Sequence, residues 1–161
     1  MEAFRPLRRH KQLLSNEETI AILQRGTHGV LAVAGDNGYP YAVPLSYVYA
    51  HGTLYFHSAT EGHKVEAMRR EKRVSFCVVD SDDVKPAEYT TFFRSAIAFG
   101  KITLLESNDE KIEALRMLGN RYHPGHDADA MREVNKSLNH VLVIRMDIDY
   151  LTGKQAIELV K

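Results

Sequence analysis

The chain lacks several features that would mark large classes of protein. One cysteine in 161 residues excludes a disulfide within the chain and any zinc or iron–sulfur site built from its own thiolates. Lysine plus arginine and aspartate plus glutamate each total 21, so the net charge is zero and no overall field attracts nucleic acid or an anionic membrane. No apolar run approaches the roughly 18 residues of a membrane-spanning helix, and the basic N-terminus lacks the apolar core of a signal peptide. We therefore expect a cytoplasmic protein that binds neither nucleic acid nor membrane.

The familiar catalytic signatures are also absent. The sequence has no Gly-x-Ser-x-Gly, no Walker loop, no Gly-x-Gly-x-x-Gly after a strand and no His-Glu-x-x-His. A hydrolase or a nucleoside triphosphatase is therefore unsupported. We find no internal repeat, low-complexity tract or linker, so we expect a single domain over residues 1–161.

Hydrophobic periodicity predicts a mainly β, α+β fold. Six strands are expected, near 29–34, 41–49, 53–57, 73–79, 89–105 and 142–150, and helices are expected over 16–25, 61–71 and 127–138 and after Ser107. Most strands are joined by hairpins and do not alternate regularly with helices. This order favours an antiparallel barrel or sheet with peripheral helices over a Rossmann fold.

Local signals add detail to this outline. Pro44 cannot donate to a β-ladder, so its strand is expected at an edge or with a bulge there, which leaves backbone groups free for a ligand. Gly100 is expected to bend the strand over 89–105, and the polar segment 80–86 is expected to be an exposed loop. Ser15 and Ser107 each stand three residues before a glutamate, which predicts a capping box at the start of a helix.

The segment 55–64 is the strongest candidate for a ligand site. A strand ends there, small and hydroxylated residues turn the chain, and a helix starts, whose first N–H groups and partial positive charge attract anions. Further donors surround this start: Ser58, Thr60, His63 and Lys64. They suit a phosphate monoester. The alternative is structural, because Ser58 and Glu61 also fit an ordinary capping box, and local spacing alone favours that interpretation.

Other reactive residue types have simpler interpretations. Cys77 lies in an apolar run and is expected to be a core thiol. His123 and His126 flank a Pro-Gly pair, so a surface loop is favoured over a metal site. The tyrosines and phenylalanines gather on strands, where they form core or a dimer interface, or flank a flat aromatic ligand.

Four segments resemble, in the same order along the chain, those of the FMN-binding split-barrel proteins related to pyridoxamine 5′-phosphate oxidase. They are 38–47, 54–64, 93–101 and 151–154. Within that family the chain looks most similar to the branch that includes nitroimidazole-resistance proteins. The resemblance implies a six-stranded antiparallel split β-barrel with peripheral helices, assembled as a homodimer that holds one FMN in each of two interface clefts.

The same resemblance implies ten cofactor-binding residues. Backbone groups of three residues would lie against the isoalloxazine ring: Val43, Pro44 and Leu45. Three more would follow the ribityl chain and phosphate: His57, Ser58 and Ala59. His63 and Lys64 would face the phosphate, and Arg94 and Ser95 would approach from the partner subunit.

Departures from the family pattern restrict the activities that the resemblance implies. The vitamin-forming oxidases commonly carry an Arg-Lys pair where this chain has His63 and Lys64, and their basic C-terminal ending is not evident here. Oxidation of pyridoxamine phosphate is therefore disfavoured. The resemblance implies an FMN-dependent oxidoreductase for a small planar substrate, with nitro-group reduction one possibility. No catalytic side chain is assigned, although His63 and Tyr47 are candidates for proton delivery.

Two alternatives stay open on the sequence. A flavin-binding carrier or redox-responsive module would use the same cofactor pocket without turnover. Haem binding on the same barrel is the other, and it rests on the eight histidines and on analogy with the fold.

Overall fold

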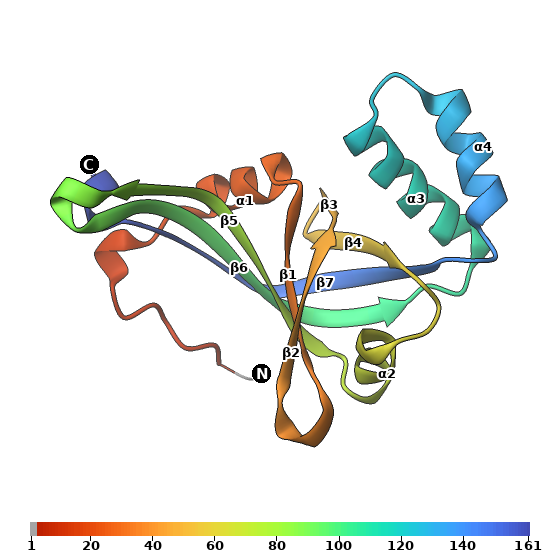
Figure 1. Ribbon diagram of the computed structural model, residues 1–161, viewed down its shortest axis with the longest axis horizontal. Helices are drawn as coiled ribbons and strands as arrows, with labels where there is room; N and C mark the ends of the chain where they lie inside the picture. Colours follow the sequence, from red (N-terminus) through yellow and green to blue (C-terminus); the bar gives the residue numbers. More distant parts are fainter. Residues whose placement is uncertain (1–2) are drawn as a thin grey trace.

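The computed structural model describes residues 3–161, so the first two residues of the domain expected over 1–161 lie outside the described range. One antiparallel sheet runs through the molecule in the order β2-β1-β5-β6-β7-β4-β3 (Figure 1). Its strands are β1 His28–Ala34, β2 Pro40–Ser46, β3 Val48–Ala50, β4 Thr53–Ser58, β5 Arg73–Lys85, β6 Thr90–Leu104 and β7 Leu142–Gln155. The expected mainly β, α+β fold is confirmed, with seven strands in place of six.

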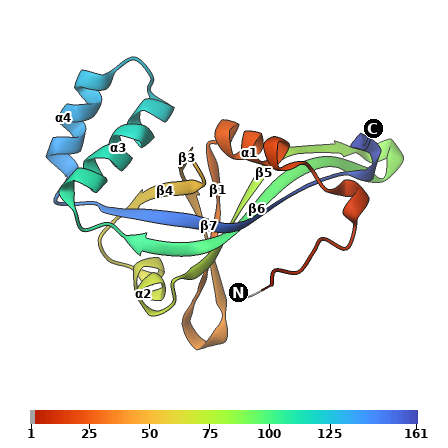
Figure 2. The same cartoon turned by 180° about the vertical axis from the view of Figure 1, so that it is seen from behind.

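Four α-helices lie at the periphery of the described sheet, as expected (Figures 1 and 2). They are α1 Asn16–Arg25, α2 His63–Arg70, α3 Asn108–Tyr122 and α4 Asp127–Ser137. Helix α1 crosses β7 closely, because a Cβ at Gly153 would overlap the side chain of Thr19. Helices α3 and α4 form a hairpin at the end of the molecule that lies opposite the C-terminus. Within residues 3–161, no helix has the length and apolar character needed to span a membrane.

The two predicted capping boxes at Ser15 and Ser107 have different outcomes. At α1 the Ser15 hydroxyl accepts from the Glu18 amide at 3.1 Å, and the Glu18 carboxylate accepts from the Ser15 amide at 3.0 Å, so this prediction is confirmed. Ser107 occupies the N-cap position of α3 but makes no capping hydrogen bond with its side chain. The prediction of a box there was wrong.

The expected strand over 41–49 is two strands, interrupted at Tyr47. Both backbone groups of Tyr47 bind the Tyr122 hydroxyl, which accepts from the Tyr47 amide at 3.0 Å and lies 2.9 Å from the Tyr47 carbonyl oxygen. These groups are therefore not available to a ladder. Strand β2 pairs with β1 and β3 pairs with β4, so the chain passes at Tyr47 from one edge of the sheet to the other. This passage curls the sheet into a barrel with a split between its edges.

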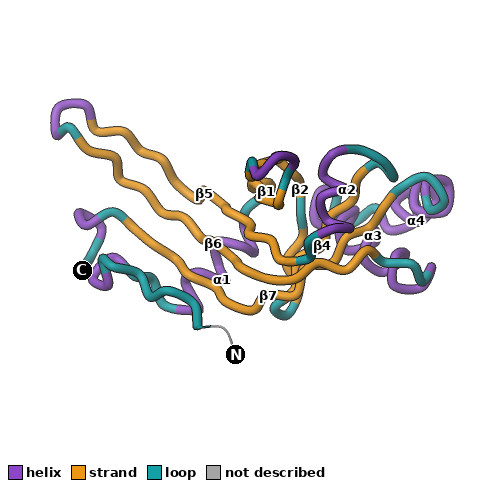
Figure 3. Tube along the Cα trace, turned by 90° about the horizontal axis from the view of Figure 1, so that it is seen from below, coloured by secondary structure: helices purple, strands orange, loops and turns teal. Residues whose placement is uncertain are grey.

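The expected loop over 80–86 was also wrong, because β5 continues to Lys85. Its outer half pairs with Thr90–Arg94 of β6, after a register shift between Val79 and Ser81. The two strands project as a ribbon away from α3 and α4 (Figures 1 and 3). Asp82 and Asp83 are exposed in this ribbon, so their charges remain in water while their backbones complete the ladder.

The bend expected at Gly100 is confirmed. The register of β6 against β7 shifts between Phe99 and Gly100, and a Cβ at Gly100 would overlap the carbonyl oxygen of Asp147. Only glycine therefore fits at this position of β6. The main core lies inside the curled sheet, and a second apolar cluster of Leu105, Ala114, Leu115, Leu118, Val134 and Val143 lies under α3 and α4.

Candidate functional site

The split of the barrel is where the first three implied residues lie. Val43 and Leu45 are half-buried against the core, and Pro44 between them is exposed. The ladder continues past Pro44, which pairs with Val30, so no bulge forms there. Pro44 was predicted to lie either in an edge strand or at a bulge. The edge strand is confirmed, since β2 lies at one edge of the described sheet. Its outer backbone groups face the split, across which β2 also contacts β4.

Helix α2 begins at the end of this split. Its N-cap is Gly62, with φ 134°, a backbone conformation that favours glycine. No side chain caps the helix, and its first intrahelical bonds are donated by Val65 and Glu66 to the Gly62 carbonyl. The amides of His63 and Lys64 precede those bonds and point out of the helix start.

The structural alternative for Ser58 does not form. Ser58 lies four residues before the N-cap, and its hydroxyl donates to the carbonyl of Ala59 at 2.8 Å. A capping box with Glu61 is therefore absent. What remains at the end of β4 is a short turn, with Ser58 half-buried and both His57 and Ala59 exposed.

His63 and Lys64 have different surroundings. The His63 ring stacks on Tyr41 of β2 with centroids 4.1 Å apart, and its Nε2 lies 3.7 Å from a carboxylate oxygen of Asp36. Asp36 also accepts from Arg70 at 2.9 Å. Lys64 is half-buried, and no described carboxylate pairs with it. Lys64 is thus the cation at this helix start that is available to a bound anion.

Arg94 and Ser95 lie apart from the other eight residues. In register, Arg94 pairs with Ser81 and Ser95 pairs with Val79, which places Arg94 at the base of the projecting part of β6 and Ser95 directly beside that base. That ribbon extends away from α2 and the end of β4 (Figures 1 and 3). Within one chain, the structure therefore brings β2, the end of β4 and the start of α2 together and leaves these two residues outside.

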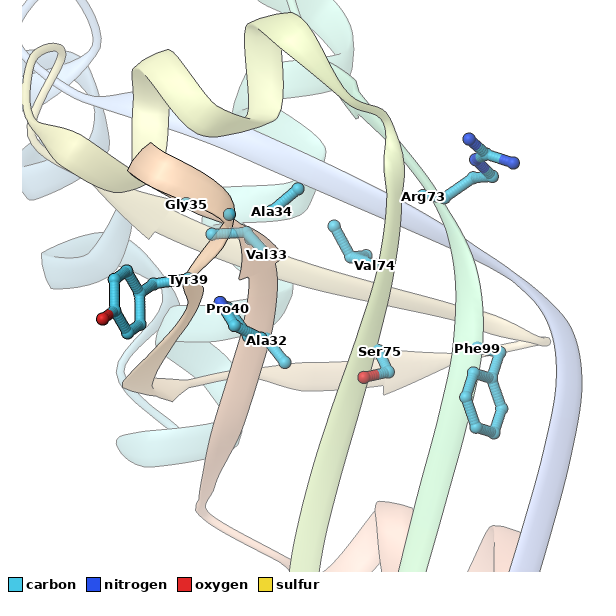
Figure 4. A pocket seen from close by; sticks show the side chains of 11 residues that line it. Ala32, Val33, Ala34, Gly35, Tyr39, Pro40, Arg73, Val74, Ser75 and Phe99 are labelled. Atoms are coloured by element: carbon cyan, nitrogen blue, oxygen red, sulfur yellow. The ribbon is translucent and has the colours of Figure 1, made fainter.

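A hollow that the sequence did not indicate lies on the sheet face opposite α1. The β1–β2 hairpin lines one side and β5 and β6 line the other, around about 430 Å³ (Figure 4). A neighbouring hollow of about 790 Å³ shares Arg73, Val74 and Phe99, and Phe4 and Tyr150 stack there with centroids 4.9 Å apart. None of the ten implied residues lines either hollow.

A third cavity, of about 710 Å³, lies between α3, α4 and the sheet. His57 and Ser46 line it on the sheet side, and Leu118, Tyr122 and Glu133 are among the helix residues that line it. Helical periodicity predicts the two helices but does not connect them with His57. Only the fold brings residues 46, 57 and 115–141 to one place.

Tyr47 is unsuited to proton delivery. Its side chain is buried, its hydroxyl donates to the Leu23 carbonyl at 2.6 Å, and burial raises the pKa of this phenol well above its usual range.

The other candidate residues follow the sequence expectations more closely. His123 and His126 lie in the expected exposed turn, and the centroids of their stacked rings are 3.7 Å apart. Residues 3–161 contain no group of three or more His, Cys, Asp or Glu side chains placed to hold a metal. Cys77 is half-buried rather than fully buried, and burial raises its pKa.

Comparison with known proteins gives the fold a family. No curated protein matches the chain. Among solved structures, a putative 5-nitroimidazole antibiotic resistance protein from Bacteroides thetaiotaomicron is 24% identical, with a TM-score of 0.73 over 89% of this chain and 86% of that one. An FAD and haem binding protein from Mycobacterium smegmatis is 25% identical, with a TM-score of 0.79 over 91% and 74%. An FAD-binding protein from Mesorhizobium loti is 26% identical, with a TM-score of 0.61 over 90% and 97%.

The sequence itself matches a family over most of its length. The model of the family described as pyridoxamine 5′-phosphate oxidase covers residues 15–155. This range contains all ten implied residues and every strand of the described sheet. The chain is a member of the pyridoxamine 5′-phosphate oxidase family of split-barrel proteins.

Proposed function

We propose that the protein is a flavin-dependent oxidoreductase that binds FMN at the split of the barrel and acts on a small planar molecule. The observation that carries this proposal is the start of α2, which is uncapped, basic and placed beside the free edge of β2. Family membership gives that anion site its cofactor class, and two of the similar structures are named as FAD-binding proteins. FMN, which carries one phosphate, is our choice because the proposed anion site is a single helix start.

The phosphate would bind at the turn between β4 and α2. The amides of His63 and Lys64 and the Lys64 ammonium would supply the donors, and the Ser58 hydroxyl would turn from the Ala59 carbonyl to the phosphate. His63 is held toward Asp36 by its stacking on Tyr41, so we assign it a supporting role at the edge of the phosphate. His57 and Ala59, which are exposed on either side of Ser58, would follow the ribityl chain.

The ring would lie along the outer edge of β2. Val43, Pro44 and Leu45 alternate between half-buried and exposed, and proline has no N–H of its own, so neighbouring amides and carbonyls make the polar contacts. When bound, the flavin supplies the hydride or electron transfer. The chain then needs only to bind and orient it, which agrees with the absence of a catalytic signature from the sequence.

A homodimer would complete the site. The accessible surface of the chain is 10131 Å², about 2,000 Å² more than the roughly 8,100 Å² typical of a compact 18.3 kDa monomer. This excess is comparable to what obligate dimers bury. Large apolar side chains are exposed along the ribbon, with Val79 at 62%, Val84 at 58% and Tyr89 at 97%. Pairing of two ribbons would cover them and bring Arg94 and Ser95 to the partner's split.

The first experiment is the absorption spectrum of the purified protein together with its mass in solution. We expect a yellow dimer that releases FMN on denaturation, identified by chromatography against FAD. Protein that is colourless and still fails to bind added FMN would contradict the proposal. A monomer that binds FMN with full affinity would contradict the dimeric site alone.

Turnover separates the enzyme from the carrier or redox module. We expect NADH or NADPH to bleach the bound flavin, and a quinone or nitro compound to restore its colour. Flavin that neither nucleotide reduces would favour the carrier. The cytoplasmic location expected from the sequence belongs to this proposal, since both nucleotides are supplied there.

A further inference from the structure

We propose that the cavity beneath α3 and α4 is the substrate pocket, and that it takes an uncharged, flat ring molecule. This inference rests on the proposed flavin site, because it assigns the space next to that site. The hairpin of α3 and α4 stands over the end of β4 and the start of β7 (Figures 1 and 2). It adds to the barrel a chamber of about 710 Å³, within the range of pockets that hold drug-sized molecules.

The lining of the cavity reaches the residues assigned to the flavin at two positions. His57 lines the cavity and is also one of the residues assigned to the ribityl chain. Ser46 lines the cavity and directly follows Leu45, which is assigned to the ring. A molecule in the cavity would therefore lie next to a flavin in the split.

The walls are apolar and suit a flat ring. Leu115, Leu118, Val134 and Val141 contribute them, and the first three belong to the buried cluster under the helices. Gly119 and Ala130 also line the cavity where α3 and α4 approach each other, so no large side chain divides the space. Burial of an uncharged ring against such walls is favourable without any matched charge.

The charges around the cavity disfavour an anion. The lining has no lysine or arginine, and beside the imidazoles of His57 and His123 its ionisable acids are Asp129 and Glu133. Asp129 is paired with Arg132, whereas Glu133 is exposed and has no ion-pair partner among the described residues. A phosphate or carboxylate ligand would lose water without gaining a lysine or arginine partner and would meet the Glu133 carboxylate.

The cavity is held open by contacts that do not involve a ligand. The Tyr122 hydroxyl at the end of α3 binds both backbone groups of Tyr47 and the Thr27 carbonyl, which ties the helix to the sheet. At the other end, the Lys111 ammonium donates to the Leu138 carbonyl at 2.8 Å and ties α3 to the end of α4. The pocket is therefore formed before its ligand arrives, which lowers the cost of ordering on binding.

Calorimetry on FMN-saturated, oxidised protein tests this inference with two matched probes. Menadione is an uncharged naphthoquinone, and 1,4-naphthoquinone-2-sulfonate is an anion on the same ring system. We expect menadione to bind at least about tenfold more tightly, the scale of a single unpaired charge contact. We expect Ser137→Phe, which fills the cavity from the end of α4, to weaken menadione at least about tenfold and to leave FMN affinity unchanged.

A charge reversal at the exposed Glu133 of the cavity lining gives a second test of the pocket. Glu133→Lys should raise the affinity for the sulfonate and leave menadione and FMN within about twofold, whereas Glu106→Lys, at an exposed residue outside the cavity, should change nothing. Equal affinity for both quinones, menadione binding that Ser137→Phe does not weaken, or sulfonate binding that Glu133→Lys does not raise would overturn the pocket while leaving the flavin site intact. Purified protein with a haem Soret band would overturn the assignment of the cavity. Failure to bind FMN at all would contradict the proposed function itself, and with it the pocket that rests on that function.

Discussion

Helices α1 and α2 both follow a Ser-x-x-Glu pattern, and the two patterns have opposite outcomes. At α1, Ser15 and Glu18 each satisfy a backbone N–H of the other, and the helix start needs no further partner. At α2, Ser58 is too far from the N-cap and donates to Ala59 instead. The glycine at the α2 N-cap has no side chain with which to replace it.

The charges in the first turn of each helix also distinguish α2 from the other helices. Helices α1, α3 and α4 each begin with two acidic residues: Glu17 and Glu18, Asp109 and Glu110, and Asp127 and Asp129. Helix α2 begins with His63 and Lys64, and its first turn has one acidic residue, Glu66. Because the N-terminal end of a helix attracts negative charge, α1, α3 and α4 are stabilised by two carboxylates each, whereas α2 has one carboxylate beside two basic residues. A basic helix start without a side-chain cap is thus a more specific sign of anion binding than a serine pattern.

Removal of Lys64 gives the largest effect expected from this comparison. Lys64→Ala should weaken FMN binding by about 1.5–3 kcal/mol, or roughly 10- to 150-fold in Kd, because a hydrogen bond to a charged group is lost. The midpoint of thermal unfolding without FMN should change little, since Lys64 has no ion pair among the described residues. Flavin fluorescence quenching measures the affinity.

Arg69→Ala is the matched control, because it removes one exposed positive charge from the other end of the same helix. We expect wild-type FMN affinity from it. If Arg69→Ala and Lys64→Ala weaken FMN equally, the cofactor senses only the general charge of α2. If neither variant does so, the phosphate does not bind at this helix start.

The two serines give the next largest effect, on stability. Ser15→Ala should lower the free energy of unfolding by about 1 kcal/mol, the usual value of an N-cap, and leave FMN affinity unchanged. Ser58→Ala should lower it by less than about 0.5 kcal/mol, because no cap is lost. Urea unfolding of the FMN-free proteins measures both. Equal losses of stability would mean that Ser58 stabilises the helix start after all.

The smallest effect is the pH dependence of the α1 cap. Hydrogen bonds with Ser15 hold the pKa of Glu18 below its ordinary value. The stabilisation by this carboxylate is therefore complete above the unfolded-state pKa and is lost as the pH falls through the folded-state pKa. The stability difference between wild type and Glu18→Gln should stay constant from about pH 8 to 5 and shrink below about pH 4. A difference that increases on acidification would contradict the assigned capping box.

Much of the fold could be predicted from local patterns. The helix over 16–25 was correct at both ends because its N-cap box and the following Gly26 are short-range signals. The β7 strand was found from its strict alternation, although the structure extends it to Gln155. The segments that failed depend on distant partners. Tyr47 is taken out of the ladder by Tyr122, 75 residues later, and residues 80–85 become a strand because β6 pairs with them.

The candidate site also has one part that local sequence signals predict and one part that depends on distant residues. The start of α2 was visible in the sequence as a basic turn between a strand and a helix. The cavity under α3 and α4 was not, because His57 reaches it from a strand more than 50 residues before the helix faces that line it. Local spacing also misjudged Ser58, since it cannot say where a helix begins to within a residue or two.

The projecting ribbon of β5 and β6 has a consequence for how the protein would behave in solution. If Arg94 and Ser95 act in the partner's site, every bound flavin holds two chains together, and every dissociation of the dimer opens both sites. Flavin affinity would then fall on dilution, and added flavin would shift monomers toward dimers by the same coupling free energy. The amount of protein in a cell would itself set how much of it carries cofactor.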